Sequence, residues 1–166
     1  MRRVSILLLC IAFTLSLCSC KKKVTEVQEP AEFFYCHESA YKTDEGVIGS
    51  EIREAVRFNG NLELLMQAYL LGPLSDDLES PLPYAVKLVS FDQLGDSVYL
   101  TLSREFSTLS GIRLTTACSC IVMTLNAFAD VKQVCFRVAS GQLDNKDELI
   151  MTISDIVLMD NTFEKG

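Results

Sequence analysis

The strongest constraint on the fold is that two segments of helical hydrophobic periodicity lie among segments that alternate apolar and polar residues. The first places apolar side chains at spacings of three, four, seven and eight between Leu62 and Leu70. The second has the same periodicity between Leu114 and Phe128. Because the flanking segments have the two-residue period of strands, the sequence predicts a mixed protein in which helices cover a sheet.

The ends of the helices are indicated by capping residues. Asn61 precedes the first helix, and its side chain can accept a hydrogen bond from an otherwise unpaired backbone amide. Gly72 tolerates the left-handed conformation that ends a helix, and Pro73 cannot continue the ladder of hydrogen bonds. Ser110 is the corresponding candidate cap of the second helix.

The second helix has one predicted apolar stripe. Three polar or small residues, Thr116, Cys120 and Thr124, fall off this stripe, so we expect them to point away from the core. The stripe itself consists of Leu114, Ala117, Cys118, Ile121, Val122, Leu125 and Phe128.

The predicted strands complete an α/β architecture of the α+β sandwich type. A hairpin is expected where residues 93–96, with Gly95 among them, separate two alternating segments, and residues 75–83 read as a polar loop. Two helices and about five strands predict one sheet with both helices on one face. The expected strands are residues 32–37, 47–53, 86–92, 97–103 and 134–138, with residues 149–153 as an added edge strand.

The amino terminus has the layout of an export signal. Arg2 and Arg3 precede an apolar run over residues 4–17, which is too short to span a bilayer comfortably. The sequence Leu17-Cys18-Ser19-Cys20 then resembles a bacterial lipobox, which predicts cleavage after Ser19 and a diacylglycerol on the Cys20 thiol. Cys18 is a weaker candidate because Leu17 would then occupy the position that requires a small residue.

The predicted domain organisation follows from this signal. Residues 1–19 are the signal peptide, residues 20–31 a lipidated cysteine with a polar tether, and residues 143–166 a carboxyl-terminal extension of the central domain. Lys21, Lys22 and Lys23 could either attract anionic lipid head groups or form a solvated linker. Without the signal, 13 basic and 22 acidic residues give a charge of −9, which argues against nucleic acid as a partner.

Four cysteines remain in the body of the protein, and they allow three complete disulfide pairings. Cys118 and Cys120 lie two residues apart on a predicted helix, so they point to nearly opposite sides and cannot readily bond to each other or share a metal ion. Cys36 and Cys135 each lie in a predicted strand and could meet across a sheet. With His37 as the only histidine, we expect neither a metal site nor a cofactor.

The ordered motifs resemble the GerM domain of sporulation and spore-germination lipoproteins. The helix that ends in Leu70-Leu71-Gly72-Pro73 is similar to the family's helix closing in Leu-x-Gly-Pro. The resemblance covers residues 32–142. Further segments that are similar to the family follow in the same order as in the family. They are Pro81-Leu82-Pro83 before residues 86–90, the turn and strand over residues 95–103 with Phe106, residues 121–125, residues 131–134 and Gly141.

The resemblance implies a noncatalytic module at the outer face of the cytoplasmic membrane or in the periplasm. Its fold is then similar to ring-building domains, and its expected partners are the membrane, through the lipid on Cys20, and an envelope protein complex, homo- or hetero-oligomeric. Family members are associated with envelope remodelling in sporulation or germination. The family brings no catalytic residues.

A search of the sequence for common catalytic motifs agrees with the expectation of a noncatalytic module. The sequence contains no Gly-x-Ser-x-Gly elbow, His-Glu-x-x-His helix or phosphate-binding glycine loop. A Ser-His-Asp triad would have to use His37, which we expect to be an exposed polar residue. The alternative hypothesis is a peptidoglycan-binding accessory or a cell-wall enzyme that uses paired acids, although nothing in the sequence places two acids across a cleft.

Overall fold

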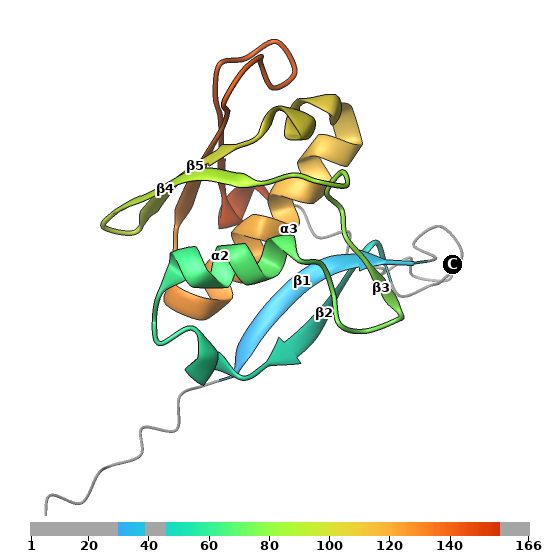
Figure 1. Ribbon diagram of the computed structural model, residues 1–166, viewed down its shortest axis with the longest axis vertical. Coiled ribbons are helices and arrows are strands. Elements are labelled where there is room, and N and C mark those ends of the chain that lie inside the picture. The colour runs from blue at the N-terminus through green and yellow to red at the C-terminus, as the bar shows by residue number, and fades with distance from the viewer. Residues whose placement is uncertain (1–29, 39–45, 157–166) are drawn as a thin grey trace, which may run out of the picture.

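Two sheets make up the protein, and one long helix contacts both of them (Figure 1). The computed structural model describes residues 30–38 and 46–156. Its elements in chain order are β1 (Ala31–His37), β2 (Ile48–Arg53), η2 (Ala55–Arg57), α2 (Leu62–Leu70), β3 (Leu78–Glu79), β4 (Leu88–Leu94), β5 (Ser97–Leu102), η3 (Arg104–Thr108), α3 (Gly111–Ala129), β6 (Gln133–Val138), β7 (Leu149–Thr152) and η4 (Ile153–Asp155).

The first sheet has the order β2-β1-β3, and both pairs are antiparallel. Strand β3 is only two residues long and pairs with Cys36 and His37 at the end of β1. The rest of this edge of β1 therefore lacks a strand partner among the described residues. At this edge the backbone amide of Phe34 donates a hydrogen bond of 3.0 Å to the Oγ1 atom of Thr124 on α3.

The second sheet has the order β4-β5-β6-β7. Strands β4 and β5 form the predicted hairpin, in which Gly95 has a φ of 64° that favours glycine. Strands β5 and β6 are parallel, and η3 and α3 connect them. Strand β7 is the antiparallel edge strand predicted near residues 149–153.

Most helix ends lie where the sequence predicts them. The Asn61 side chain caps α2 by accepting hydrogen bonds from the amides of Glu63 at 2.9 Å and Leu64 at 3.1 Å. Gly72 follows α2 with a φ of 89°. Ser110 does precede α3, but its side chain makes no capping hydrogen bond, so the predicted role of this side chain is wrong.

The mixed α+β class is confirmed, whereas the prediction of one sheet covered on one face by both helices is wrong. Helix α3 packs against β1 of the first sheet and also against β6 and β7 of the second. Its second face is therefore buried too: Cys120 and Thr124, expected to point away from the core, lie inside it. Local periodicity missed this because each sheet covers a different face of the same helix.

Smaller differences concern the strands and the amino terminus. The predicted loop over residues 75–83 contains β3, and β4 lies two residues later than expected, with a register irregularity between Leu88 and Ser90. The predicted signal peptide, with Ser19, and the predicted lipidation site Cys20 lie outside the described residues. Helix α3 is long and apolar enough to cross a membrane by length and composition, but it is a core helix of this domain.

The four described cysteines are free thiols. Cys118 and Cys120 lie two residues apart on α3. Cys36 lies in β1 of the first sheet and Cys135 in β6 of the second. The suggestion that these two cysteines meet across a sheet is therefore wrong.

Candidate functional site

Strand β2 directs charged side chains inward and an apolar side chain outward. Glu51 and Arg53 lie on one face of the strand, and each side chain is only 10% exposed. Ile52 lies between them on the other face and is 61% exposed. This arrangement reverses the usual pattern, so the buried pair needs polar partners to offset its lost hydration.

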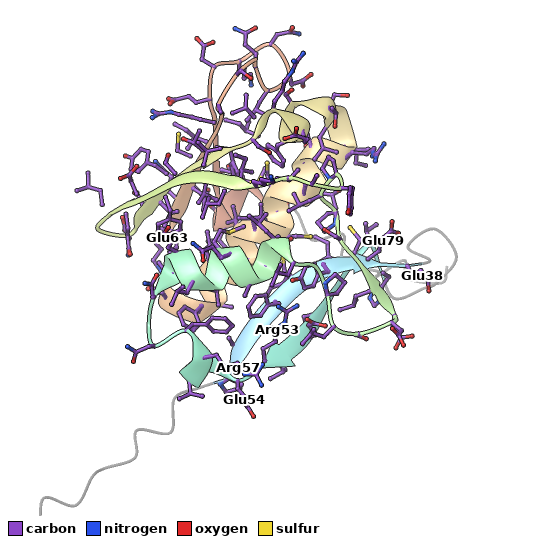
Figure 2. The ribbon with its side chains drawn as sticks, in the orientation of Figure 1. Glu38, Arg53, Glu54, Arg57, Glu63 and Glu79 are labelled. Atoms are coloured by element: carbon purple, nitrogen blue, oxygen red, sulfur yellow. The ribbon has the colours of Figure 1, made fainter. Side chains whose placement is uncertain are left out.

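Arg53 finds these partners at the carboxyl end of α2, where Figure 2 shows it between α2 and the first sheet. Its guanidinium donates hydrogen bonds to the carbonyl oxygens of Ala68 at 3.2 Å and Gly72 at 2.7 Å, and it forms an ion pair with Glu51. The last carbonyls of a helix lack partners within the helix and carry partial negative charge. Arg53 therefore supplies the positive charge that the last turn of α2 lacks.

Glu51 holds the chain that follows the helix. Its carboxylate accepts hydrogen bonds of 2.9 Å from the amides of Leu74 and Ser75. Burial raises the pKa of Glu51, but the hydrogen bonds from Ser75, Arg53 and Leu74 together lower it below its ordinary value. We call this ion pair with its contacts to residues 68–75 the Glu51–Arg53 clamp.

Aromatic rings form the floor beneath the clamp. The guanidinium carbon of Arg53 lies 4.2 Å from the ring centroid of Phe33, within the range of a cation–π interaction. Arg53 also donates a hydrogen bond of 3.1 Å to the hydroxyl of Tyr35. The Tyr35 hydroxyl in turn donates at 3.1 Å to the carbonyl oxygen of Tyr69, which also accepts a hydrogen bond from the amide of Gly72.

The clamp fixes a loop that presents apolar side chains to solvent. Leu71 is 88% exposed and Leu74 is 75% exposed, on either side of Gly72 and Pro73. We call residues 71–74 the Gly-Pro loop. Exposed leucines on a backbone held by a buried ion pair form a pre-ordered surface, which loses little conformational entropy on contact with another protein.

The predicted site residues are distributed unevenly around this loop. Gly72 and Pro73 are part of it, Asn61 lies at the opposite end of α2, and Gly95 lies in the hairpin of the second sheet. His37 is half-buried rather than exposed as expected, because its imidazole packs over Gly49. The described ranges hold no group of three or more potential metal-ligating side chains.

The clamp itself was missed by the sequence analysis. Glu51 and Arg53 appear there only as members of the strand expected over residues 47–53. A usable signal existed, because two opposite charges at positions i and i+2 of a strand with isoleucine between them predict an inward-facing ion pair. Their partners on residues 68–75 could not be foreseen, since they depend on tertiary packing.

The comparison with known families places most of the chain in a family. The model of the family Germane, described as sporulation and spore germination, matches residues 38–144. No curated protein sequence matches the chain significantly.

Solved structures are similar in fold at low sequence identity. The first GerMN domain of the sporulation protein GerM from Bacillus subtilis is 14% identical, with a TM-score of 0.51 over 72% of this chain and 91% of that one. The tandem GerMN domains of the same protein are 20% identical to this chain, with a TM-score of 0.50 over 68% of this chain and 39% of theirs. This chain therefore spans about two fifths of that structure. A candidate lipoprotein from Clostridium perfringens is 18% identical to this chain, with a TM-score of 0.49 over 78% of this chain and 91% of that one.

Proposed function

Because the chain belongs to the Germane family of sporulation and spore germination, we propose that it is a noncatalytic, lipid-anchored assembly domain of the cell envelope. The lipid on Cys20 is proposed to hold the domain outside the cytoplasmic membrane. The Gly-Pro loop is proposed to contact another protein of an envelope complex. The observation that carries this second part is the exposure of Leu71 and Leu74 on a clamped backbone.

Two features support a protein partner for this loop. Leucine side chains provide apolar area without a chemical group that could act on a substrate, so their contribution to function is contact. The clamp makes three hydrogen bonds to the backbone of residues 72–75 within 3 Å, which holds the loop in one conformation before contact. A module that works by assembly requires such a preformed surface, whereas catalysis requires convergent polar groups.

The contact is tested by charge substitution in the cells that produce the protein. The variant Leu71→Glu with Leu74→Glu should lose in-cell crosslinks to envelope proteins, because carboxylates disrupt an apolar contact. The matched control is Leu94→Glu at the tip of the β4–β5 hairpin, a leucine that is 73% exposed. We expect this control to keep the crosslinks and both variants to keep the parental melting temperature. Unchanged crosslinks in the loop variant would refute the proposed surface.

The anchor is tested separately by mass and fractionation. The intact mass of the membrane-extracted protein should show acylation at Cys20, and Cys20→Ser should release the protein from the membrane fraction. An unmodified cytosolic protein would refute the anchor.

A third experiment tests the alternative function, in which the protein acts on peptidoglycan. Incubation of the purified protein with peptidoglycan should release no fragments. Fragments whose release depends on a carboxylate would replace assembly with wall hydrolysis as the function.

A further inference from the structure

Two thiols of the protein lie on facing elements: Cys36 near the end of β1, where β3 pairs with it, and Cys120 on α3. The hydroxyl of Thr124 accepts a hydrogen bond from the amide of Phe34 at 3.0 Å and donates one to the carbonyl oxygen of Cys120 at 2.8 Å. This bridge fixes the position of α3 along β1. It therefore also fixes which residues of the two elements lie opposite each other further along the edge.

The spacing of helix and strand then places Cys120 opposite Cys36. Cys36 lies two residues beyond Phe34, an advance of about 6.6 Å along a strand. Cys120 lies four residues before Thr124, about 6 Å along a helix and on the same side of it. The two elements run in opposite directions in Figure 1, so both steps lead toward the same end of β1.

The two sulfur atoms differ in accessibility as an attacking and a resolving thiol do. Cys36 is partly exposed, whereas Cys120 is fully buried. A side-chain hydrogen bond with Cys120 lowers the pKa of Cys36, which favours its thiolate, and the same interaction raises the pKa of Cys120. The other two thiols have different surroundings: Cys118 is fully buried, which raises its pKa, and Cys135 in β6 lies 3.5 Å from the carboxylate of Glu148.

We propose that Cys36 and Cys120 are a redox pair, which closes to a disulfide between β1 and α3 when a disulfide oxidant reaches Cys36. This inference rests on the proposed function for its oxidising compartment, which is the extracytoplasmic one, and the oxidant is a thiol-disulfide oxidoreductase or a small disulfide. The bond would hold the end of β1 that pairs with β3 against the core helix.

The exchange balances in two steps. The Cys36 thiolate attacks one sulfur of the oxidant's disulfide, which forms a mixed disulfide and releases one thiolate. Cys120 then gives its proton to the released thiolate and attacks the Cys36 sulfur, which expels the second sulfur of the oxidant as a thiolate that takes up a proton from water. The two protein thiols have then lost two electrons, and the oxidant's disulfide has become two thiols.

The test is disulfide mapping of the purified full chain after treatment with glutathione disulfide. Trypsin places Cys36 alone in the peptide 24–42 and Cys120 in the peptide 114–132, which also contains Cys118. We expect these peptides to be linked in the parent and in Cys118→Ala and Cys135→Ala, and unlinked in Cys36→Ala. Because Cys36 is only half-buried, this variant should fold, which circular dichroism verifies.

A stability measurement accompanies the mapping. The closed loop contains more than 80 residues, so oxidation should raise the melting temperature of the parent by roughly 10 °C. The same treatment should leave the melting temperature of Cys36→Ala unchanged.

Two results would overturn the proposal. One is that Cys36 and Cys120 stay open to alkylation after oxidation, and the other is that Cys36 links to Cys118. The oxidant is added to purified protein, so the outcome is independent of where the protein resides. A cytosolic location would refute the anchor and leave this result standing.

Discussion

Tyr35 and Tyr69 stack face to face, with ring centroids 4.8 Å apart and ring planes within 6° of parallel, yet their hydroxyl groups differ. The Tyr35 hydroxyl accepts a hydrogen bond from Arg53 and donates one to the carbonyl oxygen of Tyr69. The Tyr69 hydroxyl is buried and has no hydrogen-bond partner among the described residues. One ring therefore carries a polar group that stabilises the fold, and the other carries a polar group that has lost its hydration without replacement.

Removing each hydroxyl should change stability in opposite directions. Tyr69→Phe keeps the stacked ring and removes an unsatisfied group, so we expect the free energy of unfolding to rise by about 1 kcal/mol. Tyr35→Phe leaves one Arg53 donor without its partner and removes one of the hydrogen bonds to the Tyr69 carbonyl, which the Gly72 amide still pairs, so the free energy of unfolding should fall by about 1 kcal/mol. Urea unfolding of both variants measures this, and a loss in Tyr69→Phe would show that its hydroxyl is satisfied.

The two helix amino termini offer a second contrasted pair. Asn61→Ala removes two hydrogen bonds to the amides of Glu63 and Leu64, so the free energy of unfolding should fall by about 1 kcal/mol. Ser110→Ala removes a side chain that makes no capping bond, so the change should stay within about 0.5 kcal/mol. Equal losses in thermal or urea unfolding would contradict the difference between the two caps.

This contrast shows how far local sequence determines the structure. The bounds of α2 follow from residues next to it: Asn61 caps its start, and Gly72 with Pro73 ends it. The β4–β5 hairpin is equally local, since Gly95 has the positive φ that its turn requires. Ser110, like Asn61, is a residue type that commonly caps helices, but its side chain makes no capping hydrogen bond. Residue type therefore predicts where a cap lies but not whether its side chain bonds.

The division into two sheets was beyond local sequence. It depends on β3, two residues within a polar loop, and on α3 having a separate sheet against each face. Cys120 and Thr124 are polar or small, so periodicity places them outside the apolar stripe. In the fold, Thr124 is buried because it satisfies the Phe34 amide that no strand pairs. The clamp depends in the same way on contacts 15–24 residues apart.

The third prediction concerns the buried ion pair of the clamp. Arg53→Met keeps most of the side-chain stem but leaves the Glu51 carboxylate buried without its countercharge, and it removes the side-chain hydrogen bonds to the carbonyl oxygens of Ala68 and Gly72. We expect the free energy of unfolding to fall by about 3 kcal/mol. The matched control is Arg57→Met, whose ion pair with Glu54 is more than two-thirds exposed. This control should change the free energy by less than about 1 kcal/mol. Equal effects in urea unfolding would mean that the clamp contributes no more than a surface pair.

The last prediction is an acid dependence that originates at Glu51. Its pKa in the folded protein is below its ordinary value of about 4.3, so the unfolded chain binds the proton more readily. The stability from this ionised carboxylate is therefore fully present above the unfolded value and is lost as the pH falls through the lower, folded value. Glu51→Gln should reduce the free energy of unfolding at pH 7 and flatten its decline toward acid. Urea unfolding between about pH 3 and pH 7 measures both effects.

The control for this dependence is Glu105→Gln. A hydrogen bond from the Ser103 hydroxyl also lowers the pKa of Glu105, but that carboxylate is fully exposed and water screens its interactions. Glu105→Gln should therefore keep most of the parental acid dependence. If the two variants have the same pH profile, the amides of Leu74 and Ser75 do not hold the ionised form of Glu51, and the clamp cannot be what orders the Gly-Pro loop.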